Sequence, residues 1–412
     1  MGAKIINILH VCPDYPPLVR GGGAETFKLL TETWRECGHN VTVLSTLQKN
    51  KNLNNLPKKD NLGDPILFHL FSLPKIFKEA TFFAPLIFAE HHKLLKWIKR
   101  NYYKFDYIVI NGITETISRE VLFHLPATMK DRIILINHGL PTAKYDKFLS
   151  FISIIVHKSI GKILVMKSNK IVVFSDSSAY EYNGFYGLGV EQKLYQFPLG
   201  IDFRQFKQIY RFLSHDETNI RYWTHKLGIK SKFIFSIGRN VRTKGFDQLV
   251  KSFSEILPEF PDLELVIGGD STEYTNELKW LTEKLKISDK VKFLGRVEES
   301  AKIALFLNCD LFVIPSLKEG FGLNAIEARV LNIKTIATLT GSHGKILDEK
   351  RCNKLIIDPE AELTNAIREM LNKQECIQKW NEGIEQKFDI KKTGKELINV
   401  MLDSVEESIK ML

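Results

Sequence analysis

Long apolar runs and paired metal ligands are absent from this sequence of 412 residues, and each absence excludes a class of protein. No apolar run is long enough to cross a bilayer, and the start, Met1-Gly2-Ala3-Lys4, leads us to expect no secretory signal. The five cysteines, an odd number, lack the close spacing of metal ligands, so we interpret them as small core residues in a reducing cytoplasm. No Asp-x-Asp pair is present to hold a divalent ion, which predicts a protein that works without a metal.

Acidic residues are scarce in the first half of the chain. Residues 1–210 hold 27 Lys and Arg against 17 Asp and Glu, whereas residues 211–412 hold 31 of each, so the net charge of +10 belongs to the first half. This excess suits an anionic membrane surface, an acidic substrate or nucleic acid, and equally a solvated lysine-rich surface. The composition, 44% hydrophobic and 26% charged, is that of an ordinary globular protein, and its length predicts two or three domains.

Short apolar runs recur along the chain with helical stretches between them. They are rich in Val, Ile and Phe and lack strict alternation, which is typical of parallel strands buried on both faces. Two sets of six runs predict two doubly wound α/β domains. The runs are 5–11, 41–44, 107–110, 133–136, 171–174 and 194–197 in the first half, and 233–237, 263–267, 291–294, 311–314, 335–337 and 355–357 in the second.

The stretches between the runs predict amphipathic helices. Residues 24–37 repeat apolar side chains at helical spacing and end at Gly38, a C-cap residue, and residues 247–257 show the same spacing. The stretches 210–230 and 376–412 lack strand character. The predicted domains are therefore 1–205, joined by a C-terminal helix at about 393–412, and 206–392.

Four segments of the first half mix aromatic and apolar side chains with lysines. They are 65–71, 81–88, 93–100 and 151–167. An amphipathic basic segment can lie on an anionic membrane, and it can equally be a core helix with a solvated lysine face. The sequence leaves both interpretations open.

Two glutamates, Glu319 and Glu327, bracket a glycine-bearing turn that follows the apolar run 311–314. The first N–H groups of a helix have no internal partner, and Gly320 and Gly322 let a ligand approach them closely, which predicts a phosphate site. Carboxylates would repel a phosphate, but they accept hydrogen bonds from hydroxyl groups. A ligand that carries both phosphates and many hydroxyls is a nucleotide sugar.

Further polar groups are expected at the carboxyl ends of strands, where open α/β sheets bind ligands. Arg239 and Lys244 follow the first strand of the second half and suit a diphosphate. In the first half, the glycine run 21–23 precedes a helix, so its backbone can reach a phosphate or a sugar ring, although its spacing is not that of a dinucleotide fingerprint. His138 follows the fourth run and is either a ligand group or an ordinary core or surface histidine.

Together these residues resemble the retaining nucleotide-sugar glycosyltransferases of family 4, whose GT-B fold pairs two Rossmann-like domains across a cleft. The resemblance covers nearly the whole chain and is strongest over residues 233–341. It rests on Gly238-Arg239, Lys244-Gly245, Phe293-Leu294-Gly295, Pro315-Ser316, the spacing of Glu319 and Glu327, and Pro198-Leu199-Gly200-Ile201-Asp202. The chain departs from the family in three places. The family usually has a proline where this chain has residues 332–335, a Gly-x-Gly at 268–271 and a glycine pair at 341–344.

The resemblance implies a role for each matching residue. The cations would neutralise the leaving diphosphate, Glu319 would bind hydroxyls of the transferred sugar, and Glu327 would bind the ribose hydroxyls. His138 would contact the sugar from the opposite wall, and the loop at Gly22-Gly23 would close on the phosphates. The implied catalytic residues are Arg239, Lys244, Glu319 and His138. The implied binding residues for the sugar donor are Gly22, Gly23, Arg239, Lys244, Arg296, Val297, Glu319, Phe321, Gly322, Leu323 and Glu327, with no metal.

The implied function is that of a retaining glycosyltransferase in glycan, glycolipid or cell-surface polysaccharide synthesis. It would need no cofactor and would use a UDP-, GDP- or ADP-sugar, with residues 1–205 binding a glycan, a lipid-linked saccharide or another hydroxyl acceptor. The expected location is the cytoplasm, with peripheral contact to an anionic membrane and no nucleic acid partner. Two alternatives stay open: a nucleotide-sugar epimerase of the same fold, and a non-catalytic basic module that binds membrane or nucleic acid.

Overall fold

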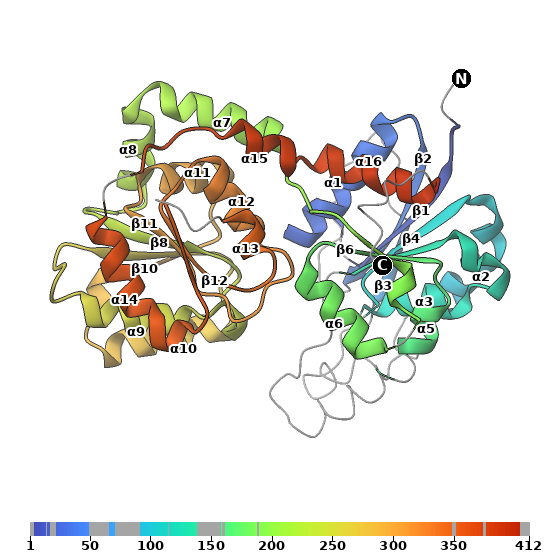
Figure 1. Cartoon of the computed structure of the whole chain (residues 1–412), viewed down its shortest axis with the longest axis horizontal. Coiled ribbons are helices and arrows are strands. Elements are labelled where there is room, and N and C mark those ends of the chain that lie inside the picture. Colours follow the sequence, from blue (N-terminus) through green and yellow to red (C-terminus); the bar gives the residue numbers. More distant parts are fainter. Residues whose placement is uncertain are drawn as a thin grey trace. The chain divides into compact units, whose positions relative to one another are not determined.

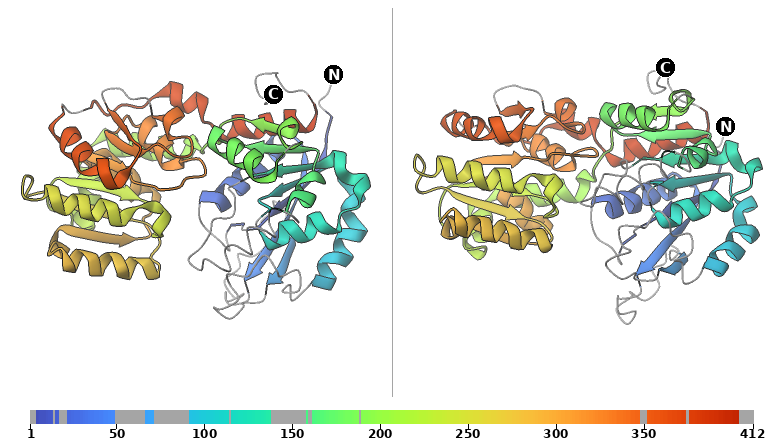
Figure 2. Two further views of the ribbon diagram at one scale, coloured as in Figure 1. Left: turned by 60° about the horizontal axis from the view of Figure 1, so that its bottom comes forward. Right: turned by 90° about the horizontal axis from the view of Figure 1, so that it is seen from below.

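The chain folds into two compact units, Met1–Gly200 with Ile390–Leu412 and Ile201–Asp389 (Figure 1). The computed structural model describes residues 4–13, 15–16, 22–48, 66–70, 91–113, 115–137, 158, 161–187, 189–347, 352–373 and 376–403. In each unit a sheet of parallel strands lies between layers of helices, as the two further views show (Figure 2). The chain passes from one unit to the other at Gly200–Ile201 and at Asp389–Ile390, within a few residues of the predicted boundaries.

The first unit has a sheet of seven strands in the order β3-β2-β1-β4-β5-β6-β7, all parallel. The prediction of six strands is therefore wrong for this unit, because Ile66–Leu70 forms an additional edge strand. The strands are β1 (Asn7–Cys12), β2 (Asn40–Gln48), β3 (Ile66–Leu70), β4 (Tyr107–Asn111), β5 (Ile133–Ile136), β6 (Lys170–Val173) and β7 (Leu194–Gln196). The helices are α1 (Gly22–Glu36), α2 (His91–Asn101), α3 (Thr116–His124), α5 (Lys162–Met166), α6 (Asp176–Tyr186) and α16 (Ile390–Met401).

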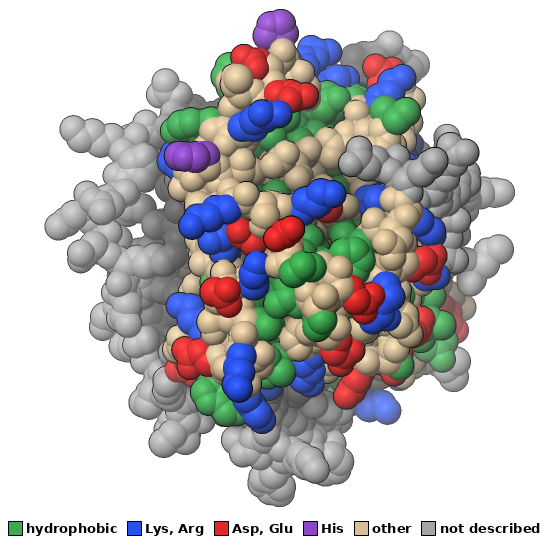
Figure 3. All heavy atoms as spheres, turned by 90° about the vertical axis from the view of Figure 1, so that its left-hand side faces the viewer, with side chains coloured by type: hydrophobic (Ala, Val, Ile, Leu, Met, Phe, Trp, Pro, Cys, Tyr) green, Lys and Arg blue, Asp and Glu red, His purple; other side chains and the backbone are tan. Residues whose placement is uncertain are grey.

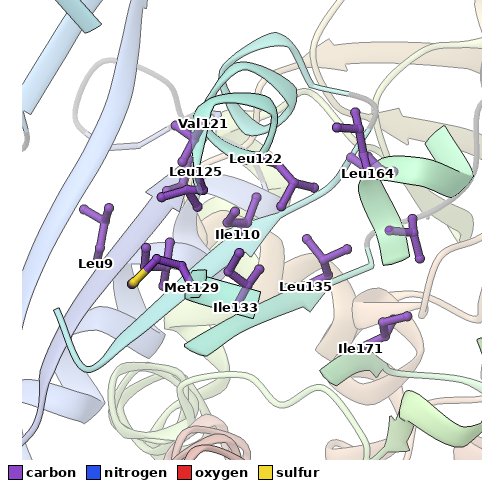
Figure 4. Packing of buried hydrophobic residues seen from close by; sticks show 14 of the residues in the cluster. Leu9, Ile110, Val121, Leu122, Leu125, Met129, Ile133, Leu135, Leu164 and Ile171 are labelled. Atoms are coloured by element: carbon purple, nitrogen blue, oxygen red, sulfur yellow. The ribbon is translucent and has the colours of Figure 1, made fainter. Parts of the chain in front are cut away.

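Aliphatic side chains from strands and helices fill the core of the first unit (Figure 4). Leu9, Ile110 and Ile133 come from β1, β4 and β5, and α3 adds Val121 and Leu122. The described part of the basic aromatic segments joins this core. Helix α2 buries Leu94 and Ile98 while its lysines are exposed, so this segment is a core helix with a solvated lysine face. Residues 81–88 lie outside the described part of the chain.

The last described helix, α16, packs on α1 within the first unit. The indole N–H of Trp34 donates to the carbonyl oxygen of Gly394 at 3.0 Å, and both groups are buried. A Cβ on Gly394 would lie 2.6 Å from the Cγ2 atom of Thr33, so only glycine permits this close approach.

The second unit has a sheet of six parallel strands in the order β10-β9-β8-β11-β12-β13. All six were predicted from their apolar runs. The strands are β8 (Phe233–Ile237), β9 (Glu264–Gly268), β10 (Val291–Gly295), β11 (Leu311–Ile314), β12 (Thr335–Thr338) and β13 (Asn353–Ile356). The helices are α7 (Phe203–His215), α8 (Glu217–Lys226), α9 (Phe246–Ile256), α10 (Glu273–Lys284), α11 (Glu299–Asn308), α12 (Leu323–Val330), α13 (His343–Ile346), α14 (Pro359–Asn372) and α15 (Glu382–Lys387).

The cysteines behave differently from one another. Cys12 and Cys309 are buried free thiols, as expected, and Cys37 is a half-buried free thiol. Cys352 and Cys376 form a disulfide with their Cα atoms 5.9 Å apart. The interpretation of all five as free core residues is therefore wrong, because the fold brings the start of β13 beside the segment that follows α14.

The described residues contain no helix that is long and apolar enough to span a membrane. On the face of the second unit in Figure 3, Lys and Arg side chains are interspersed with Asp and Glu side chains. This agrees with the balanced charge of residues 211–412.

Candidate functional site

The carboxyl ends of the parallel strands of the second unit share one edge of the sheet, and hydrogen bonds join the loops there. The side-chain amide of Asn324 donates to the carbonyl oxygen of Ile237 at 2.6 Å, which ties the start of α12 to the end of β8. The backbone N–H of Ser342 donates to the carbonyl oxygen of Phe321 at 3.0 Å and adds the loop after β12. The loops after β8, β11 and β12 thus form one connected site, as open α/β sheets favour.

Lys244 and Glu319 form an ion pair between the first two of these loops. Their side chains are 22% and 12% exposed, and the hydroxyl of Ser316 donates to the same carboxylate oxygen at 2.8 Å. Burial opposes the charge on Glu319, but the Lys244 ammonium and the Ser316 hydroxyl outweigh it and hold the pKa of Glu319 below its ordinary value. The ammonium is therefore held at the strand end by a carboxylate that stays charged near neutral pH.

Helix α12 begins at the site without a side-chain cap. Its N-cap residue, Gly322, has a φ of 103°, a conformation that glycine adopts readily and other residues avoid. The backbone of Phe321, Gly322 and Leu323, which we call the α12 cradle, presents N–H groups that have no partner within the helix. An anion is favoured at this position by those N–H groups and by the helix dipole.

Glu327 lies one turn further along α12 and is buried, with its side chain 11% exposed. One carboxylate oxygen, Oε1, accepts from the Lys302 ammonium at 2.7 Å, whereas Oε2 is buried and has no hydrogen-bond partner among the described residues. Burial opposes the charge on Lys302, but Glu327 and Glu299 outweigh it and raise the pKa of Lys302 above its ordinary value. For Glu327 burial is the larger effect and raises the pKa of the carboxyl above its ordinary value, although the Lys302 ammonium opposes it. The orphaned oxygen Oε2 is suited to accept a hydrogen bond from a hydroxyl group.

Two further groups that the sequence singled out lie at neighbouring strand ends. Arg239, which follows β8 after Gly238, is exposed. Arg296 and Val297 follow β10, and a Cβ on Gly268 would lie 2.9 Å from Cγ2 of Val297, so the loop after β10 packs closely on the end of β9. These residues border the same edge of the sheet as the α12 cradle.

Sequence reasoning missed two residues of the site, the half-buried Lys302 and the buried His343. Lys302 is a charged residue in an otherwise apolar turn of α11, where Ala301, Ile303 and Ala304 are buried, and that contrast was the available signal. His343 was noticed only as part of a departure from the family pattern. It is fully buried, and its Nδ1 atom lies 2.7 Å from the carbonyl oxygen of Thr338.

The predicted site residues of the first unit have mixed outcomes. Gly22 and Gly23 form the first turn of α1 and are exposed, so the expected loop is wrong for these two residues because the helix begins at Gly22. His138 lies outside the described residues. Within the described ranges, no group of three or more His, Cys, Asp or Glu side chains is arranged to hold a metal ion.

The chain is similar to known proteins in sequence and in structure. Residues 221–387 match the protein family described as Glycosyl transferases group 1. Over 156 residues the chain is 30% identical to the mannosylfructose-phosphate synthase of Agrobacterium fabrum, which covers 36% of this chain and 34% of that protein. The chain thus aligns with about a third of the length of the curated relatives it matches.

Two solved structures are similar over nearly the whole chain. Sucrose-phosphate synthase from Thermosynechococcus elongatus has a TM-score of 0.68 at 18% identity, and the match covers 98% of this chain and 96% of that one. HepE from Anabaena, solved in complex with UDP and glucose, has a TM-score of 0.66 at 17% identity, with 97% and 100% covered. At these identities the likeness establishes the fold.

Proposed function

We propose, from the premise that this chain belongs to the glycosyl transferases group 1 family and has the GT-B fold, that it is a sugar transferase. It moves a sugar from a nucleoside-diphosphate sugar to an acceptor hydroxyl and retains the configuration at the anomeric carbon. The products serve glycan, glycolipid or cell-surface polysaccharide synthesis.

The buried Oε2 atom of Glu327 is the observation that carries this proposal. An unpaired carboxylate oxygen in a protein interior is unfavourable by about 1–3 kcal/mol or more unless a ligand supplies a donor. One turn away, the α12 cradle favours an anion. A ribose whose hydroxyls donate to Glu327, with its diphosphate on the cradle, satisfies both groups at once.

Lys244 and Arg239 supply the positive charge of the reaction. When the bond from the sugar to the diphosphate breaks, negative charge grows on the leaving phosphate, and fixed cations stabilise it without a metal ion. Glu319 accepts hydrogen bonds from hydroxyls of the transferred sugar and also orients Lys244 through their ion pair. The acceptor hydroxyl attacks on the face from which the phosphate departs, and that phosphate helps to take its proton.

The remaining contacts of the sugar donor are assigned by the same proposal. Phe321, Gly322 and Leu323 hold the sugar and the phosphates through their backbone, and the backbone at Arg296 and Val297 meets the base. For Gly22, Gly23 and His138 the proposal keeps the roles that the resemblance implies. No cofactor is needed, and a UDP-, GDP- or ADP-sugar is the donor.

The acceptor is proposed to bind the basic N-terminal domain. The excess of Lys and Arg in residues 1–210 supports a lipid-linked saccharide at an anionic membrane surface on the cytoplasmic side. Exposed lysines of α2, beside its buried Leu94 and Ile98, are available for such contact.

Incubation with UDP-, GDP- and ADP-glucose in EDTA, followed by NMR, tests the proposed function. These donors are α-linked, so transfer to water with retention releases α-glucose first. Initial release of β-glucose would contradict retention. An epimerised nucleotide sugar would indicate the epimerase alternative, and unchanged donors together with salt-sensitive vesicle binding would indicate a non-catalytic module.

A further inference from the structure

His343 has a buried polar atom for which the proposed reaction has no role. Its Nδ1 atom lies 2.7 Å from the carbonyl oxygen of Thr338, and since a carbonyl can only accept, Nδ1 carries the hydrogen. In the neutral ring the other nitrogen, Nε2, therefore carries a lone pair and no hydrogen, so it can only accept a hydrogen bond. It is buried and has no hydrogen-bond partner in the described part of the chain.

This nitrogen borders the α12 cradle. A Cβ on Gly322 would lie 2.6 Å from Nε2 and 2.5 Å from Cδ2 of the same ring, so the imidazole edge faces the N-cap residue directly. The absence of a side chain at position 322 leaves room for the ring. The orphaned nitrogen and the N–H groups at the start of α12 therefore border the same residue, Gly322.

The charged groups that face the ring are Glu319, from the loop after β11, and Lys244, from the 3-10 turn after β8. Burial lowers the pKa of His343 below its ordinary value, the Thr338 carbonyl and Glu319 oppose this effect, and Lys244 adds to it. The ring is thus neutral in the free protein at neutral pH. A bound diphosphate would add negative charge beside it and favour the protonated ring.

We propose that His343 is a proton-linked positioning residue for the diphosphate of the sugar donor. As the diphosphate binds, Nε2 takes a proton from solvent and donates the new N–H to a phosphate oxygen. This inference rests on the proposed function, because it requires a nucleotide sugar at the α12 cradle. Protonation of His343 would make the affinity for the nucleotide sugar depend on pH, which the fixed charges of Lys244 and Arg239 do not do.

The direction of the pH dependence follows from the two states of the ring. The pKa of His343 is low in the free protein and higher in the complex, so between these two values binding takes up a proton. In that range the association constant rises as the pH falls, by up to about tenfold per pH unit for one linked proton. Above both pKa values the affinity no longer changes with the protonation of this residue.

Calorimetric titration with UDP-, GDP- and ADP-glucose in buffers of different ionisation enthalpy measures the proton uptake directly. Nucleotide sugars suit this experiment because their diphosphate has no proton that titrates near neutral pH. His343→Asn keeps an amide N–H near the position of Nδ1 for the Thr338 carbonyl and removes Nε2. His225→Asn, on the exposed end of α8, is the matched control.

We expect the wild type and His225→Asn to take up the same fraction of a proton when the nucleotide sugar binds. We expect His343→Asn to bind the nucleotide sugar more weakly and without this proton uptake. Binding by the wild type without proton uptake would overturn this inference and leave the proposed function standing. The same uptake in a folded His343→Asn variant would also overturn it. Failure of the wild type to bind any nucleotide sugar would overturn both.

Discussion

Buried charges at the α12 site must be compensated, because an unpaired charge in a protein interior is strongly unfavourable. Glu319 is compensated by Lys244, and Glu327 is compensated by Lys302. Each pair joins two loops or helices that are far apart in the sequence. The polar residues that would contact a nucleotide sugar therefore also hold the site together, and their substitutions affect stability and activity to different degrees.

Removal of either proposed catalytic cation should slow transfer. Arg239→Ala and Lys244→Ala should each lower the rate of nucleoside diphosphate release by about 10²-fold or more, because the growing phosphate charge loses its stabilisation. Arg242→Ala is the matched control, since Arg242 lies in the same loop but pairs with the exposed Glu277. Initial rates in the presence of EDTA provide the measurement, and full activity in folded variants would contradict the assignment.

Removal of Lys302 should destabilise the second unit. Lys302→Met leaves the Glu327 carboxylate buried without a counterion, which costs about 3–5 kcal/mol of unfolding free energy. Lys354→Met removes a partly exposed partner of Glu369 and should cost about 1 kcal/mol or less. Denaturant unfolding compares the two variants. Equal losses would show that the buried pair does not carry the energy assigned to it.

The sequence predicted part of this site because some residues have a local signal. Arg239 and Lys244 lie beside Gly238 and Gly245 after the apolar run 233–237, and Glu319 and Glu327 bracket a glycine-bearing turn after the run 311–314. Position along the chain was therefore sufficient to select them. Lys302 could not be paired with Glu327 from the sequence, because that contact depends on how α11 packs beside α12. His343 was missed for the same reason, since its burial against Gly322 depends on the loop after β12.

At the scale of elements, the start of α12 depends on a glycine conformation and on the close approach of the loop after β12. Gly322 combines a φ of 103° with contact to the His343 ring. A side chain at position 322 would add backbone strain of roughly 1–3 kcal/mol and would displace the imidazole. The geometry of the anion position is thus determined jointly by α12 and by the loop after β12.

Gly322→Ala should therefore lower both stability and nucleotide affinity. Gly383→Ala is the control in the same unit, because Gly383 lies in α15 and a Cβ there would be 3.4 Å from its nearest neighbour, Oδ1 of Asn381. Thermal unfolding with and without UDP, GDP or ADP measures both effects. A Gly322→Ala variant with wild-type stability and affinity would exclude the cradle as the phosphate site.

The elements of the second unit were easier to predict than those of the first. Each of its strands contains a short apolar run, because helices cover both faces of the sheet. Strand β3 was missed because it is an edge strand whose sequence, Ile-Leu-Phe-His-Leu, lies within a segment that resembled an amphipathic basic stretch. The α1 start at Gly22 was missed because a glycine run normally favours a loop.

For the molecule as a whole, the family match and the fold agree with the interpretation of the sequence. The family match covers residues 221–387, which hold the ion pairs and the α12 cradle, whereas the structural likeness extends over nearly the whole chain. The Cys352–Cys376 disulfide removes the argument for a reducing compartment that was based on the cysteines. The basic excess lies in residues 1–210.

A thermal-shift comparison of UDP, GDP, ADP and TDP, each with and without EDTA, tests the central claim most directly. A nucleoside diphosphate at 100 times its dissociation constant should add about 2.7 kcal/mol to the free energy of unfolding. We expect at least one of the four to raise the melting temperature equally with and without EDTA, and Glu327→Ala to abolish that rise. No rise with any of the four would contradict a nucleotide-sugar site in the second unit.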